Sequence, residues 1–285
     1  MTTHSRFHRV LTTTAALLVL ACLGLMSRPA EAAVLSLTIS DHNASATIEP
    51  TSGRGMLDWT VDGYQHLEQQ WFWYRVGQDK EHNLSDLDLV GYRLIDTNWD
   101  DANDLLALKY SDPGGKFEIE LRLVMTGGSP GTGLSDIAET ISIKSTSDQP
   151  LDFHFFQYCD LNLMGTETDQ SVEITNGNSA TQLDMSASVS ETVETPPANH
   201  FQAGIGSETL DMLTNDDPNT LGDVAGPLGP GDLTWAFEWD FTLGPEGSST
   251  DSFLISKDKY VTPEPAALSL LAAGALALTL RRRRK

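Results

Sequence analysis

Three residues that could move protons lie in one apolar segment, 151–163. His154, Tyr158 and Asp160 are separated by four and then two positions. Because side chains alternate along a β-strand, one face of a strand here would carry all three. A histidine base with a nearby carboxylate is the minimum for proton transfer. No nucleophile elbow, zinc-ligand spacing or phosphate-binding loop accompanies them, so we expect a structural role for His154 and no catalytic residue.

An acidic segment that follows residue 95 could hold a cation. Asp96, Asn98 and Asp100 place oxygen-bearing side chains at alternate positions, as in loops that supply Ca²⁺ with roughly six to eight oxygens. No glycine stands at the sixth position, and Ala107 stands at the twelfth, where a bidentate glutamate belongs. The alternative is a solvated acidic loop. Calcium at this triplet is the one cofactor for which the sequence gives a reason, and no other is expected.

Aromatic side chains are dense near residue 70 and could bind sugar. Trp71, Trp73, Tyr74 and Trp99 could form a platform on which sugar rings stack, with Arg75 fixing hydroxyl groups. The alternative is that these rings belong to the core or to cross-strand pairs. A glycan-binding role and a core role are both open at this point.

The elements that must position these groups are strands. Apolar and polar residues alternate over many short segments, as in 117–123, and turns rich in Gly, Pro and Asp separate them. Segments 71–76 and 151–163 are apolar on both faces, which predicts strands buried on both sides. The last predicted strand covers 252–255. We therefore predict a mostly-β fold, a large antiparallel β-sandwich.

The charge and the cysteines limit the partners. The chain of 285 residues has a formal net charge of −22, and many of its basic residues lie near the two ends, so the middle is more acidic still. Such a surface repels nucleic acid, which we therefore exclude as a partner. Cys22 lies in the predicted leader, so Cys159 has no partner for a disulfide and is expected to be a small buried hydrophobe.

The first 32 residues have the pattern of a signal peptide. A basic start is followed by an apolar stretch over 15–26 and then by Ala30-Glu31-Ala32, a small-x-small pattern that signal peptidase accepts. Cleavage is expected between Ala32 and Ala33. The partners implied are the export machinery and signal peptidase.

The C-terminus carries three segments in a fixed order. Pro263-Glu264-Pro265 precedes an apolar run, 266–280, and five basic residues end the chain: Arg281, Arg282, Arg283, Arg284 and Lys285. The apolar run would rise about 22 Å as a helix, which is short of the roughly 30 Å hydrocarbon core of a bilayer. The basic cluster would stay in the cytoplasm and act as a stop-transfer device. We therefore expect a short C-terminal transmembrane helix.

This order of segments resembles the PEP-CTERM sorting signal of Gram-negative and related bacteria. The resemblance implies that an exosortase-type membrane protease recognises Pro263, Glu264 and Pro265 and removes the helix and the basic tail. It also implies a transient anchor in the inner membrane, then display on the cell surface or release into the extracellular matrix, often with exopolysaccharide. It implies nothing about the activity of the rest of the chain.

Part of the middle resembles a second family. The segments 142–147 and 151–156, and the later segment 235–241 with Leu243-Gly244-Pro245, are similar to large bacterial sandwiches of the galactose-mutarotase-like type. This resemblance implies the architecture only.

These features predict a signal peptide (1–32), a β-sandwich domain (33–260) and a sorting signal (261–285). The expected function is that of an exported structural or interaction protein of the cell envelope or extracellular matrix. The alternatives are an exopolysaccharide-binding module and a mutarotase-like or lyase-like carbohydrate-active enzyme. Because no catalytic motif is present, we expect a role other than catalysis.

Overall fold

The computed structural model describes residues 34–263. The predicted signal peptide with Ala30, Ala32 and Ala33, and the tail from Glu264 to Lys285 with its predicted helix, lie outside these residues. Within 34–263, no helix combines the length and the apolar character needed to cross a membrane.

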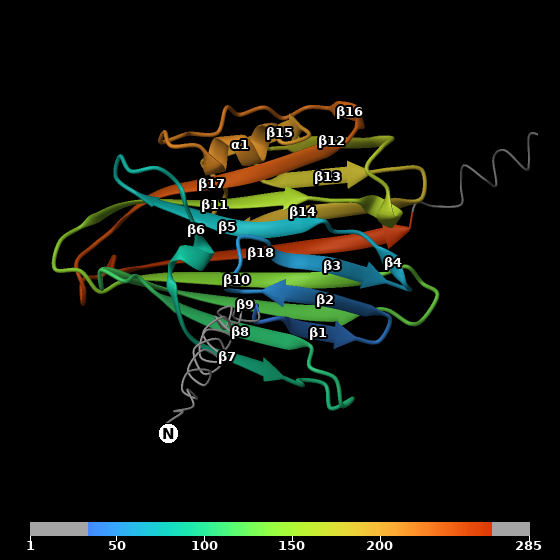
Figure 1. Ribbon diagram of the computed structural model, residues 1–285, viewed down its shortest axis with the longest axis horizontal. Coiled ribbons are helices and arrows are strands. Elements are labelled where there is room, and N and C mark those ends of the chain that lie inside the picture. Colours follow the sequence, from blue (N-terminus) through green and yellow to red (C-terminus); the bar gives the residue numbers. More distant parts are fainter. Residues whose placement is uncertain (1–33, 264–285) are drawn as a thin grey trace, which may run out of the picture. The chain divides into compact units, whose positions relative to one another are not determined.

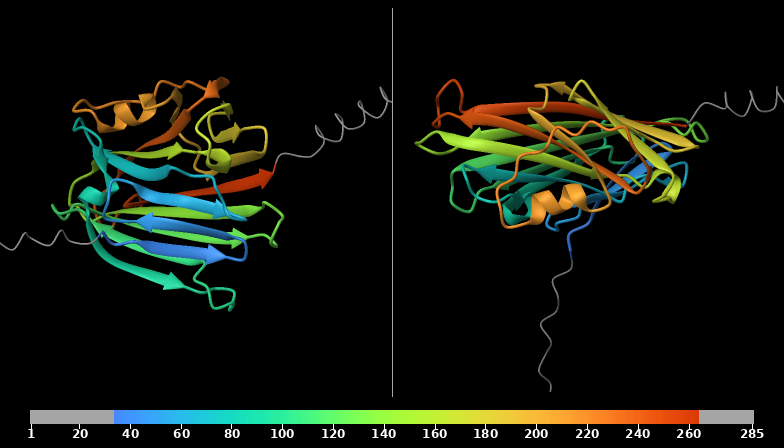
Figure 2. Two further views of the ribbon diagram at one scale, coloured as in Figure 1. Left: turned by 45° about the vertical axis from the view of Figure 1, so that its right-hand side comes forward. Right: turned by 90° about the horizontal axis from the view of Figure 1, so that it is seen from above.

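Two nine-stranded sheets pack face to face, as the two layers in Figure 2 show. The main strands of sheet A run in the order β1 (Leu37–Asp41), β2 (Ala44–Glu49), β3 (Gly55–Val61), β5 (Gln69–Val76), β11 (Leu151–Asp160), β17 (Leu233–Leu243) and β15 (His200–Ile205). The short strands β4 (Tyr64–Gln65) and β6 (His82–Asn83) pair with β3 and β5. Only β3 and β5 pair in parallel among these strands.

Sheet B is antiparallel throughout the described residues. Its order is β16 (Leu228–Gly231), β12 (Gln170–Thr175), β13 (Ser179–Leu183), β14 (Ala187–Thr195), β18 (Ser252–Pro263), β10 (Ser135–Ser145), β9 (Phe117–Gly127), β8 (Leu105–Ser111) and β7 (Asp88–Ile95). The helical elements are α1 (Glu208–Thr214), η1 (Leu84–Asp86) and η2 (Leu163–Gly165). The predicted mostly-β antiparallel sandwich is confirmed (Figure 1).

The alternation in the sequence builds the core. Along β9, the apolar residues from Phe117 to Met125 are buried at every second position, and their polar neighbours face outward. β5, β11 and β17 are buried on both faces over most of their length, as expected for the first two. Their inner faces meet sheet B, whereas α1 contacts the outer side of β15 and β17 (Figure 2). Thr209 and Leu213 of α1 are fully buried in this contact.

The last strand is longer than predicted, and its additional part carries lysines whose side chains are buried between the sheets. β18 extends beyond residue 255 to Pro263, and Lys257 and Lys259 point between the sheets at 1% and 0% exposure. Lys257 Nζ lies 2.6 Å from Glu139 and 3.2 Å from Glu191, both of which are buried. Two glutamines of sheet A donate their side-chain N–H groups to these acids. Gln70 Nε2 donates to Glu139 at 2.7 Å, and Gln157 Nε2 donates to Glu191 at 2.9 Å. Buried charges persist when they are paired and hydrogen-bonded in this way.

Candidate functional site

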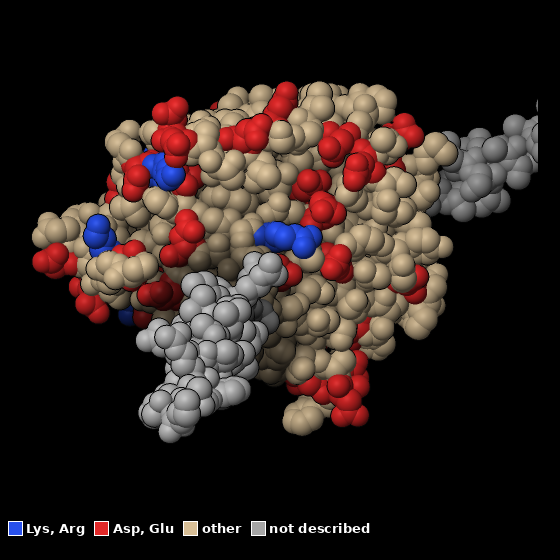
Figure 3. Space-filling view, viewed as in Figure 1, with Lys and Arg blue, Asp and Glu red and all other residues tan. Residues whose placement is uncertain are grey.

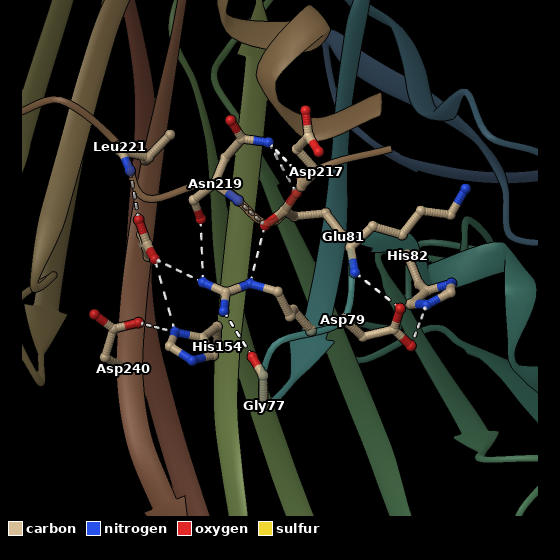
Figure 4. Close-up of polar contacts among 12 residues, drawn as sticks. Gly77, Asp79, Glu81, His82, His154, Asp217, Asn219, Leu221 and Asp240 are labelled. Atoms are coloured by element: carbon tan, nitrogen blue, oxygen red, sulfur yellow. Dashed lines mark hydrogen bonds and ion pairs between the residues drawn. The ribbon is translucent and has the colours of Figure 1, made fainter. Parts of the chain in front are cut away.

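Strand register brings a polar row together on the outer side of sheet A. His154 on β11 is paired with Arg75 on β5 and with Asp240 on β17. Two positions earlier on β17, Glu238 is paired with His200 of β15. Because paired residues point to the same face, these five side chains form one cluster, part of which Figure 4 shows.

The innermost part of the cluster is a buried ion pair. Arg75 Nε donates to Glu81 at 3.0 Å, and both side chains are at most 4% exposed. The remaining guanidinium N–H groups reach backbone oxygens, with NH1 bonded to Gly77 at 2.8 Å and NH2 to Asn219 at 3.1 Å. Asn219 in turn donates its own backbone N–H to Glu81 at 2.8 Å. The pair therefore fastens the segment that follows α1 onto sheet A.

Glu238 is covered by the segment after α1, which includes Asn219 and Leu221. Its side chain is fully buried, and its Oε2 accepts the backbone N–H of Leu221 at 2.7 Å. Burial raises the pKa of Glu238 to about 8, and Asp240 adds to this, although the Leu221 N–H and Arg75 oppose it. The other oxygen, Oε1, lies 3.8 Å from both Arg75 NH2 and His154 Nδ1. A carboxyl group so enclosed cannot touch a ligand while residues 219–221 stay in place.

The accessible part of the cluster is a chain of alternating carboxylates and imidazoles. His154 Nδ1 hydrogen-bonds to Asp240, and its Nε2 lies 3.7 Å from Asp152. His200 lies 3.7 Å from the other oxygen of Asp240 and hydrogen-bonds to Asp223 at 3.1 Å. The exposed fractions of these side chains run from 14% for His154 to 63% for Asp152. Such a row offers several donors and acceptors to hydroxyl groups of a ligand.

The cluster also has the ligand types of a transition-metal site. One ligand atom from each of His154, Glu238 and Asp240 lies within 4.8 Å of the others. One Glu238 oxygen is already bonded to Leu221, and His154 Nε2 is buried, which leaves Asp240 as the most accessible of the three side chains.

The proton-transfer set suggested by the sequence is divided in the structure. His154 points outward to Asp240, whereas Tyr158 Oη donates to Asp160 at 3.3 Å further along β11. Phe156, fully buried, lies between them on the same face. Burial, with the nearby Asp232 carboxylate, raises the pKa of Asp160 to about 7. The carboxylate that hydrogen-bonds to His154 comes from Asp240 on β17, 86 residues away.

Three of the four aromatic residues suggested for sugar stacking are unsuited to that role. Trp71, Trp73 and Tyr74 are 0%, 3% and 8% exposed, because β5 is covered on both sides. Gly55 allows this for Trp71: a Cβ there would lie 2.0 Å from the indole, and its φ of +65° favours glycine. Trp99 alone is free to stack, at 90% exposure.

The acidic side chains suggested for calcium are largely hydrogen-bonded to the backbone of their own loop. The two oxygens of Asp96 accept the backbone N–H groups of Trp99 and Asp101, at 2.6 and 3.1 Å. Asp101 has a φ of +70°, and thus adopts the left-handed conformation that glycine would supply at the sixth position. Asn98 donates its side-chain amide to Asp41 at 2.8 Å, and Asp100 lies within ligand distance of Asp41 and His42. Calcium binding stays a prediction.

The sequence indicated that Glu238 and Asp240 of β17 lie on one face of a strand. The segment 234–241 alternates apolar side chains with Thr234, Ala236, Glu238 and Asp240, so both acids had to share one face of a strand. That this face lies beside His154 depends on the pairing of β11 with β17. Glu81 and Asn219 lie in loops, so no alternation of apolar and polar residues indicated that they would meet Arg75.

Comparison with known proteins finds likeness in structure alone. No protein-family model matches the chain, and no curated protein matches it in sequence. A bacterial glucoamylase solved with acarbose superposes with a TM-score of 0.58 at 9% identity, covering 86% of this chain and 35% of that one. The Slr1438 protein of Synechocystis sp. PCC 6803 gives 0.52 at 11% identity, covering 81% and 97% of the two chains.

A galactose 1-epimerase from Lactobacillus acidophilus NCFM is also similar, with a TM-score of 0.49 at 10% identity, covering 81% of this chain and 99% of that one. A galactose mutarotase-like protein is also among the structural neighbours. This chain spans only about a third of the glucoamylase. At these identities, the likeness concerns the β-sandwich fold.

Proposed function

We propose that this chain is an exported protein of the cell envelope or extracellular matrix, sorted through its C-terminal PEP-CTERM signal. The observation that carries the proposal is the order of Pro263-Glu264-Pro265, an apolar run and a basic cluster at the end of the sequence. β18 ends at Pro263, which is exposed and paired with Ala187, so the motif begins at the last residue of the sandwich. The implied partners are signal peptidase and an exosortase-type protease.

The sorting proposal is tested with Glu264→Ala, because Glu264 is the charged centre of the motif that the protease would recognise. We expect the variant to keep its tail and stay in the membrane fraction, whereas the wild-type protein loses the tail. Intact mass spectrometry of protein from cell-surface and membrane fractions measures this. Glu246→Ala, an exposed change in a surface turn, is the matched control and should be processed normally. A complete tail on mature wild-type protein contradicts the proposal.

Exopolysaccharide binding is the second candidate function, and the row of Asp152, His154, Asp240, His200 and Asp223 favours it. These side chains are polar and at least partly accessible, and all but Asp223, which lies in the loop after α1, are on the adjoining strands β11, β17 and β15. Neutral hydroxyl groups suit such a row because carboxylates accept from them and imidazoles do either. Catalysis ranks below binding, since Glu238 is enclosed and an acid–base pair must reach the substrate.

Affinity electrophoresis in gels that contain the producing cell's exopolysaccharide tests this second candidate. Asp240→Asn should weaken the retention of the protein about tenfold, because a charged acceptor is lost from the centre of the row. Trp99→Ala is the control, since this exposed ring lies on the β7–β8 loop and outside the row. If Trp99→Ala abolishes retention and Asp240→Asn does not, the sugar site is on that loop instead.

A further inference from the structure

A cavity of about 300 Å³ opens at one end of the sandwich and is lined by both sheets. Its apolar surface includes the rings of Tyr74 on β5 and Phe117 on β9, whose centroids are 5.3 Å apart. Polar side chains from two separate loops complete the lining: Asp79, His82 and Asp86 around β6 and η1, and Asp112 and Lys116 in the β8–β9 turn.

The hydroxyl of Tyr74 has no hydrogen-bond partner among the described residues. The side chain is 8% exposed, yet its hydroxyl is not among the fully buried polar atoms, so it is open to the cavity that Tyr74 lines. One face of the ring is covered by His82, stacked at a centroid distance of 5.6 Å. A hydroxyl group left unpaired at a cavity can be satisfied by a ligand atom.

The charges around this hydroxyl are mainly negative. Burial raises the pKa of Tyr74, and the carboxylates of Asp112, Asp86 and Asp79 raise it further, so the phenol stays neutral and three acids face it. Asp79 and Asp86 lie 3.3 and 3.7 Å from the two nitrogens of His82. Lys116 lines the cavity as its one lysine or arginine and forms no ion pair within residues 34–263. The cavity therefore has more acidic than basic side chains.

We propose that this cavity binds a primary ammonium group on a small organic molecule or side chain. Tyr74 Oη accepts one N–H of the ammonium, Asp86 and Asp112 supply opposite charge from the two sides, and the aromatic rings contact the carbon that bears the nitrogen. A calcium ion fits poorly, because it needs roughly six to eight oxygens and rings occupy part of this lining. The site is separate from the row around His154 and does not depend on sugar binding there.

The proposal is tested by NMR titration of the purified protein with n-butylammonium and with n-butanol, which has the same carbon chain without the charge. We expect saturable shifts at Tyr74 and Phe117 with the ammonium alone. Glucosamine and Nα-acetyl-lysine methylamide then separate the two sources of an ammonium group. Tighter binding of either one supports the proposal and identifies an amino sugar or a lysine side chain as the natural ligand.

Three variants make the test specific. Tyr74→Phe should weaken ammonium binding about fivefold and leave the melting temperature unchanged or raised, because the hydroxyl has no described partner to lose. Asp86→Asn should weaken binding about threefold, and Lys116→Gln should strengthen it about twofold, since it removes a competing positive charge. Butanol binding as tightly as butylammonium overturns the proposal. Absence of saturable ammonium binding, or unchanged binding by a folded Tyr74→Phe protein, also overturns it.

Discussion

At the scale of single residues, the pKa of Asp136 depends on burial and on a carboxyl group from another strand. Asp136 lies on the outer side of β10, half-buried, with the Asp258 carboxyl of β18 nearby. Burial raises the pKa of Asp136 to about 8, and Asp258 adds to this because two adjacent carboxylates repel. We predict that the two carboxyl groups hold one proton between them at neutral pH. Nothing in the local sequence around either aspartate indicates it, since the two lie on different strands.

This pair gives a prediction about pH. Between the ordinary pKa of an aspartate, about 4, and the folded value near 8, the folded state holds a proton that the unfolded state has lost. The free energy of unfolding should therefore fall as pH rises through this window. Asp136→Asn should flatten the decline by about 1 kcal/mol, a value reduced for the partial solvent exposure of the pair.

Urea denaturation at pH 5, 6, 7 and 8 measures this dependence. The control is Asp148→Asn, which changes an exposed carboxylate in the turn after β10 and should leave the slope as it is. Equal slopes for Asp136→Asn and the wild-type protein would show that the shared proton does not exist.

At the scale of secondary-structure elements, β18 shows how a strand can bury charges. Lys257 is paired with Glu139 across to β10, and Lys259 with Glu191 across to β14, so each lysine faces an acid on the neighbouring strand. Lys257 also lies 5.4 Å from the ring centre of Phe72 in sheet A. The strand predicted from the sequence ended at 255, whereas the structure continues it through Lys257, Asp258 and Lys259. Only the partners on β10 and β14 make the inward position stable.

Removing one member of this network should be costly. Lys257→Met leaves Glu139 and Glu191 buried with Lys259 as their remaining cation, and we expect it to lower the free energy of unfolding by about 3–5 kcal/mol. The double variant Lys257→Met with Glu139→Gln removes one charge of each sign and should recover part of that loss. Chemical denaturation of the two variants measures both values. A loss below about 1 kcal/mol for the single variant would mean that the charges are hydrated in solution.

At the scale of the whole molecule, acidic side chains are spread over the surface. On the face seen in Figure 3, Asp and Glu are scattered widely and Lys and Arg gather at a few points. Several basic groups are withdrawn from the solvent, since Arg75, Lys257 and Lys259 are at most 3% exposed. Acidic side chains are buried too, among them Glu81, Glu139, Glu191 and Glu238, so the acidic character of the described surface comes from the large excess of Asp and Glu in the sequence. Such a surface disfavours contact with polyanions.

The topology also fixes where the chain can be cut. β18 lies between β14 and β10 in the middle of sheet B and pairs with them as far as Pro263 and Val261. A chain truncated after Pro263 should keep the thermal midpoint of the protein that carries the tail. A chain truncated after Ile255, where the sequence placed the end of the last strand, should fail to fold because it loses both lysines of the core. Circular dichroism melts distinguish the two, and a folded shorter chain would contradict the assigned register.

The sequence by itself determined the β-sandwich, the strands buried on both faces and the two terminal sorting patterns, because alternation and segment order are local properties. The tertiary structure decided which acids meet His154, that Trp71 and Trp73 are enclosed, and that Lys257 and Lys259 point inward. Each of these depends on pairing between strands far apart in the chain. A residue's own neighbours in sequence set the face on which it lies, but only the register across the sheet sets what it meets there.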